Sequence, residues 1–136
     1  MEIKARSWDV YMSPKYSREV GVAIKGMPVT RAITFLERVV EKKQTVELKR
    51  YNKEVPHHFG KPSRYPVKVA KHFLRLIDNA VSNAAYQGAD EARLVIDHIE
   101  VTRGHPKKTL GAKSLGKVKQ RGRRTNILLI LGEAAK

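Results

Sequence analysis

Apolar residues recur at helical spacing in three stretches of the chain. The first begins at Ser13-Pro14, a pair typical of a helix start because the Ser side chain can cap free N–H groups and Pro fits the first helical position. It ends at Gly26, since glycine readily adopts the left-handed conformation that terminates a helix. Further helices are predicted at residues 29–42 and 66–87, the latter followed by Gly88. The apolar stripe of the third helix comprises Ala70, Phe73, Leu74, Ile77, Ala80, Val81 and Ala84.

Strand-like patterns flank these helices. Residues 2–12 alternate loosely between apolar and polar and predict an edge strand or an extended segment. The apolar runs at 94–96 and 127–131 predict two further strands. Residues 44–65 have no periodicity and contain Pro, Gly and Asn, so we expect a surface loop too polar to bury.

The order of elements predicts an α+β fold: a small antiparallel sheet covered by three helices, with a long protruding basic β-hairpin. A length of 136 residues suits a single domain. Within it we expect a globular body, residues 1–103 and 125–136, and an extended hairpin, residues 104–124. The hairpin is called the arm below.

The net charge of the chain indicates a domain that binds polyanions. The chain has 28 Lys and Arg against 13 Asp and Glu, a formal net charge of +15. Such an excess predicts salt-sensitive attraction to phosphate backbones. There is no cysteine, which excludes disulfide bonds and cysteine-ligated metal. No segment is apolar over the length of a signal peptide or a membrane span, so we expect a cytosolic protein with no membrane partner.

The charge is most concentrated in the arm. From Arg103 to Arg124 there are nine Lys and Arg, four glycines and no Asp or Glu. An ordinary solvated surface mixes both signs, so the absence of acids favours contact with phosphates. Glycine allows a close approach of the backbone to RNA. The arm has no aromatic residue, which argues against single-strand binding on stacking platforms and favours recognition of a structured RNA by shape and backbone.

Catalytic and metal chemistry find little support. The His57-His58 pair lacks acidic or cysteine neighbours at ligand spacing, so we expect no metal. Glycines 111, 116 and 122 do not form a phosphate-binding loop, and no acid and base cluster is evident, so we expect neither an enzyme nor a cofactor. For His98, between Asp97 and Ile99, we expect a hydrogen-bonded structural histidine.

Several motifs match one family pattern over nearly the whole chain. The most specific is Arg64-Tyr65-Pro66-Val67-Lys68 ahead of Asn79-Ala80-x-x-Asn83-Ala84. Shorter pieces are Ser13-Pro14-Lys15-Tyr16-Ser17-Arg18-Glu19-Val20, Ala32-Ile33-x-Phe35-Leu36-Glu37, Arg50-Tyr51-Asn52-Lys53 and Leu94-Val95-Ile96-x-His98-Ile99. On these motifs the chain resembles the universal large-subunit ribosomal protein of the L twenty-two family, in its archaeal and eukaryotic cytosolic form.

The resemblance implies a structural protein embedded in large-subunit rRNA in the cytoplasmic ribosome. Its partners would be rRNA, neighbouring large-subunit proteins and the nascent polypeptide, because the hairpin of this family lines the peptide exit tunnel. Self-association is not expected. The arm tip would comprise Lys113, Ser114, Leu115, Gly116 and Lys117.

We expect RNA contacts from cations on both the arm and the body. On the arm and its root these are Arg103, Lys107, Lys108, Lys113, Lys117, Lys119, Arg121, Arg123 and Arg124. On the body they are Arg50, Lys53, Lys61, Arg64, Lys68 and Lys71. The alternative is a free-standing architectural nucleic-acid-binding protein, since charge alone does not distinguish the polymers, and Leu110 and Leu115 are its only candidate wedges.

Overall fold

A three-stranded antiparallel sheet forms the centre of the body. The structure, a computed structural model, describes residues 2–113 and 116–134. Strand β8 (Thr125–Glu133) lies between β1 (Ile3–Val10) and β5 (Leu94–Arg103) and pairs antiparallel with both. The predicted edge strand near the N-terminus is therefore confirmed.

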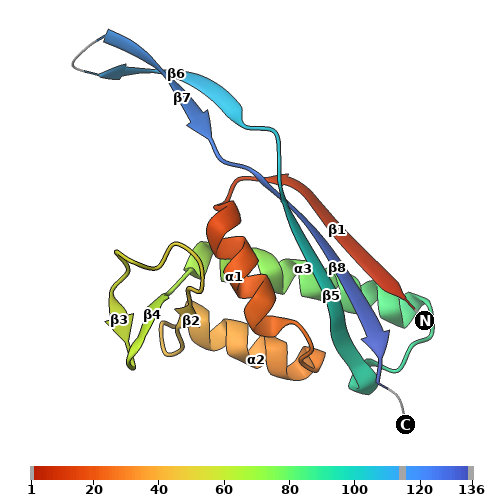
Figure 1. Cartoon of the computed structure of the whole chain (residues 1–136). Coiled ribbons are helices and arrows are strands. Elements are labelled where there is room, and N and C mark those ends of the chain that lie inside the picture. The colour runs from red at the N-terminus through yellow and green to blue at the C-terminus, as the bar shows by residue number, and fades with distance from the viewer. Residues whose placement is uncertain (1, 114–115, 135–136) are drawn as a thin grey trace.

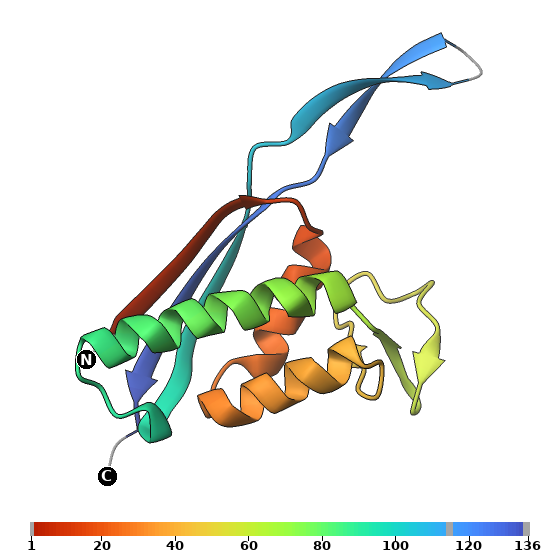
Figure 2. The same ribbon diagram turned by 180° about the vertical axis from the view of Figure 1, so that it is seen from behind.

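Three helices cover one face of this sheet (Figures 1 and 2). Helix α3 (Val67–Tyr86) packs along β1, and α1 (Pro14–Ile24) packs along β5. Helix α2 (Val29–Val40) packs on α3, and a short 3-10 turn, η1 (Glu91–Arg93), precedes β5. This arrangement confirms the predicted α+β class.

The core lies between the sheet and the helices. Along β8 the residues alternate between buried and half-buried, as expected for a strand with one covered face. Ile127, Leu129 and Leu131 point into the core, where they meet the predicted stripe of α3. Phe73 and Ile77 of that stripe are fully buried.

The helix ends agree with the sequence signals except at one cap. Gly26 and Gly88, just beyond α1 and α3, have φ of +80° and +76°, the left-handed conformation that glycine adopts without strain. Pro14 occupies the first turn of α1. The Ser13 side chain makes no capping hydrogen bond, contrary to prediction. Instead, the Ser13 carbonyl oxygen accepts hydrogen bonds from the backbone N–H and the hydroxyl of Ser17.

The prediction of a surface loop at residues 44–65 is wrong. This segment forms a second small sheet of three short strands in the order β2-β4-β3. The strands are β2 (Val46–Glu47), β3 (His57–His58) and β4 (Lys61–Arg64). Val46, Leu48 and Val55 are buried. Strands of two to four residues are too short to show a period of two in the sequence. Strand pairing orders this segment, and the sequence pattern does not reveal that pairing.

The arm is a separate two-stranded ribbon that projects from the end of the central sheet (Figure 1). Its strands, β6 (Lys107–Lys113) and β7 (Gly116–Gly122), pair only with each other among the described residues. Strands β5 and β8 continue into it through short connections. That the body folds without the arm stays a prediction.

Phe73→Ala should destabilise the chain by about 3–5 kcal/mol, because truncating a buried aromatic side chain removes apolar contacts and leaves a cavity. Phe73 is fully buried on α3. Tyr86→Ala, on the same helix at a 93% exposed position, should change the free energy of unfolding by no more than about 0.5 kcal/mol. Urea denaturation of both variants measures the difference. Equal midpoints would contradict the assigned face of α3.

Candidate nucleic-acid interface

The arm presents cations to solvent. The exposed ones are Lys107, Lys108, Arg121 and Arg123, and Arg103 at the end of β5 is exposed as well. Ser114 and Leu115 lie outside the described residues, and the side chains of residues 112–120, including Lys113, Lys117 and Lys119, lie outside the described part of the structure. For those positions RNA contact stays a prediction.

The strand register places like charges opposite each other. Lys108 pairs with Arg121 across the β6–β7 ribbon. Like charges directly opposite on one face of an antiparallel pair are destabilising. No acid occurs within the arm to relieve the repulsion, so an external anion would stabilise this surface.

Hydrogen bonds from the body fix the root of the arm. The Asp9 N–H donates to Asn126 Oδ1 (2.8 Å), and Asp9 Oδ1 accepts from the His105 N–H (2.9 Å). The Gly104 N–H donates to the Arg124 carbonyl oxygen at 2.8 Å. Asp9 has φ of +50°, at the irregularity in the β1–β8 register. The body therefore sets where the arm begins and in which direction it leaves.

Arg124 lies half-buried at this root. Its Nε is buried and has no hydrogen-bond partner among the described residues. A buried donor without a partner is costly. Arg124 thus retains an unused donor at the point where the predicted RNA-binding surface meets the body.

The body contributes a second group of cations around the start of α3. Arg64, Lys68 and Lys71, three of the residues predicted to contact RNA, are exposed. Lys68 Nζ lies 4.5 Å from the ring centroid of Tyr11. Lys61 differs, because its Nζ lies 3.5 Å from Glu47 Oε2 and is partly neutralised. None of the ion pairs found among the described residues involves Arg64, Lys68 or Lys71, so their charges are less neutralised than that of Lys61.

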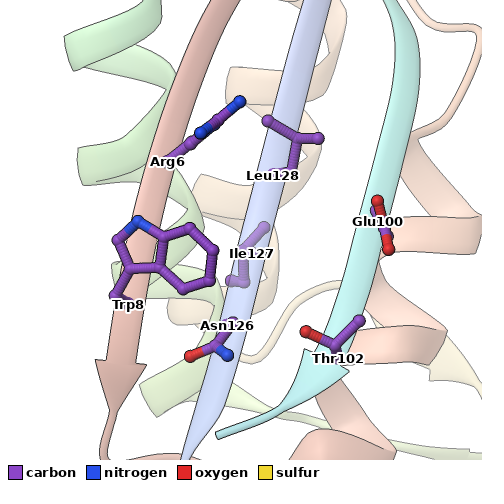
Figure 3. Close-up of a pocket in the computed structure, with 7 residues that line it drawn as sticks. All are labelled: Arg6, Trp8, Glu100, Thr102, Asn126, Ile127 and Leu128. Atoms are coloured by element: carbon purple, nitrogen blue, oxygen red, sulfur yellow. The ribbon is translucent and has the colours of Figure 1, made fainter.

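Trp8, which the sequence analysis did not single out, lies on the sheet face that the helices leave uncovered. A hollow of about 220 Å³ there is lined by Arg6 and Trp8 of β1, residues 126–128 of β8, and Glu100 and Thr102 of β5. Figure 3 shows the indole beside β8, with Glu100 and Thr102 across the hollow. Trp8 is 67% exposed, so the body presents an aromatic surface that the arm lacks.

The histidines have structural or solvent-exposed positions. The His58 ring lies 3.0 Å from the Ser63 carbonyl oxygen through Nδ1 and packs edge-on against Tyr65. Within residues 2–113 and 116–134, no group of three potential ligands could hold a metal ion. The prediction for His98 is wrong: it is exposed, and no side-chain hydrogen bond found among the described residues involves it. A register irregularity between Ile96 and His98 shifts the pairing of β5 with β8 at this position, which the neighbouring residues Asp97 and Ile99 do not reveal.

His72 should titrate below its ordinary pKa of 6.5 in the free protein. Partial burial lowers the pKa of the imidazole by disfavouring its charged form, and the neighbouring cations Arg75 and Lys68 lower it further. Arg75→Gln should therefore raise the His72 pKa, whereas Arg93→Gln, outside α3, should leave it unchanged. Ring-proton chemical shifts followed by NMR measure both. A His72 midpoint unaffected by Arg75→Gln would contradict the electrostatic part of this explanation.

No helix among the described residues is long and apolar enough to cross a bilayer.

The chain matches the family model described as Ribosomal protein L22p/L17e over residues 5–131. It is 35% identical over 135 residues to "Large ribosomal subunit protein uL22" of Methanothrix thermoacetophila, covering 96% of this chain and 89% of the relative.

Similar relatives occur in other lineages. The protein of the same name from Ignicoccus hospitalis is 36% identical over 96% of this chain and 87% of its own length. That of Aedes aegypti is 42% identical over 74% of this chain and 57% of its own length. The family model and these relatives bear out the resemblance drawn from the motifs, and the chain belongs to the L22p/L17e family of ribosomal proteins.

Proposed function

We propose that this chain is a structural component of the large ribosomal subunit in the cytoplasm, that it binds rRNA through its arm and the start of α3, and that the arm lines the peptide exit tunnel. Its partners are rRNA, adjacent large-subunit proteins and the nascent chain. Its contribution is charge and shape, with no catalytic step of its own. The membership of the family supports the ribosomal assignment.

The observation that carries the RNA-binding proposal is the construction of the arm. Two strands that pair only with each other in the described structure leave the body as a narrow ribbon. Exposed cations occur on both strands, and no acid lies between residues 103 and 124. A narrow cationic ribbon can enter a space between RNA helices that a globular surface cannot, and its charges replace the counterions of the phosphates.

The position of the tip supports the tunnel proposal. The ribbon carries the paired residues Lys113 and Gly116 to its end farthest from the body (Figures 1 and 2). If the body is anchored at the surface of the large subunit, the ribbon would place the tip of the arm in the interior of that subunit. The exposed Leu110 on β6 is the one described feature that suits an architectural DNA binder, and that reading is an outcome of the tests below.

Neutralising three arm cations, Lys107→Gln, Lys108→Gln and Arg121→Gln, should weaken RNA binding and its salt dependence. With about six to nine phosphate contacts, the slope of log affinity against log salt is roughly −4 to −8, and losing three contacts reduces it by roughly 2 to 3. Titration of the full chain with large-subunit rRNA at several salt concentrations measures this.

The control has the same loss of net charge at other exposed sites: Lys25→Gln, Lys43→Gln and Arg93→Gln. Lys43 and Arg93 lie beside Glu41 and Asp90, so their charges are already partly compensated. If the control variant lost as much of the slope as the arm variant, net charge alone would drive binding, and the arm would have no special role.

The chain should co-migrate with the large subunit in sucrose gradients of native lysate after a high-salt wash, because many buried phosphate contacts resist salt better than a few surface ones. Within those particles, a photo-crosslinking amino acid replacing Lys113 should attach to stalled nascent chains, and one replacing Lys25 should not. Migration as a free protein or with DNA would refute the ribosomal assignment. Co-migration without the crosslink from position 113 would refute the tunnel proposal alone.

A further inference from the structure

A hollow of about 210 Å³ lies where α1, the segment after β2 and the end of β5 meet, just below the arm. Its lining brings together residues distant in sequence: Lys15 and Arg18 from α1, Arg50 and Tyr51 from the segment after β2, and Arg103 from β5. Arg50 and Arg103 were predicted to contact RNA. Lys15, Arg18 and Tyr51 were not, and only the fold places them with the other two.

The charge in this hollow is unbalanced. Four of its side chains are cationic, and the one carboxylate, Glu19, is 5% exposed. Glu19 Oε1 accepts a hydrogen bond from the Arg50 backbone N–H at 3.1 Å, so it holds the segment in place. None of the ion pairs found among the described residues involves the four cations. Cations gathered without paired acids attract an external anion.

The aromatic residue of the hollow is held in an unusual conformation. Tyr51 has φ of +56°, in the left-handed region that bulky residues rarely adopt, and its side chain is 64% exposed. Lys15 Nζ donates to the Tyr51 carbonyl oxygen at 3.0 Å. The Arg50 guanidinium carbon lies 4.8 Å from the ring centroid. Residues held in strained backbone conformations cluster at binding and active sites, and Tyr51 combines such a conformation with an exposed ring beside Arg50 and Lys15.

We propose that this hollow binds a single unpaired nucleotide of the RNA, with its phosphate between Arg18, Arg103 and Lys15 and its base stacked on Tyr51. The inference rests on the proposed function, because the nucleotide belongs to the RNA that the arm binds. Stacking on an aromatic ring beside a guanidinium accommodates any base. An acidic peptide would satisfy the cations but would leave the exposed ring without a partner, so the geometry favours a nucleotide.

Two single-stranded RNA probes of 12 residues, one of adenosines and one with the same backbone but no bases, separate stacking from charge. Tyr51→Leu in the full chain should lower affinity for the adenosine probe by about 5- to 150-fold, the range for loss of one stacked base. It should leave affinity for the abasic probe unchanged, and Tyr51→Phe should retain wild-type binding. Tyr86→Leu, at the exposed end of α3, is the matched control.

Arg18→Gln with Arg103→Gln should weaken binding of both probes and reduce the salt slope by roughly 1 to 2, because two phosphate contacts are lost. Thermal unfolding of every variant confirms that the fold is retained. The inference is overturned if Tyr51→Leu binds the adenosine probe as tightly as the wild type, or if a polyglutamate peptide of equal charge competes as well as the adenosine probe. The proposed function fails separately, through the arm variant and the gradient, so the two failures are distinguishable.

Discussion

The position of β8 between β1 and β5 is the constraint on which the rest of the structure depends. Its alternate residues fill the core beneath α1 and α3, and its start is continuous with the arm. Antiparallel pairing of β5 and β8 brings Arg103 opposite Thr125, so the chain must leave and re-enter the body at adjacent points. A long insertion between these strands therefore emerges as a hairpin and not as an open loop.

Electrostatic repulsion opposes this arrangement in the free protein. A net charge of +15 destabilises a compact state through self-repulsion, and the register sets Lys108 against Arg121. The four ion pairs of Lys or Arg with carboxylates found among the described residues are exposed, and such pairs contribute only about 0–1 kcal/mol each. The hydrophobic core must therefore hold the body together, and a bound polyanion would relieve the repulsion along the arm.

Sequence patterns predicted the elements whose signals are local and long. The apolar stripe of α3 extends over about four turns, and the absence of acids from the arm is visible without a structure. The pairing of short strands and the meeting of distant residues at one site were harder to predict from the sequence. Strands β2 to β4 are too short for periodicity, and the irregularity beside His98 breaks the expected alternation. Arg18 and Arg103 are 85 positions apart (103 − 18) and share a hollow only because α1 packs on β5.

Pairing and anchoring of the arm also bear on the RNA binding proposed for it, because a basic segment held in this way does not behave as a disordered tail. A disordered tail loses backbone entropy when it binds, at about 1–2 kcal/mol per ordered residue. Strand pairing in β6 and β7 restricts the arm before binding, and Asp9 holds His105 and the start of the ribbon. The entropy that remains to be lost on binding is then smaller, so it offsets less of the favourable free energy of phosphate contact. Because Arg103 lies in both the hollow and the arm root, RNA bound at the body as proposed would constrain the direction of the ribbon.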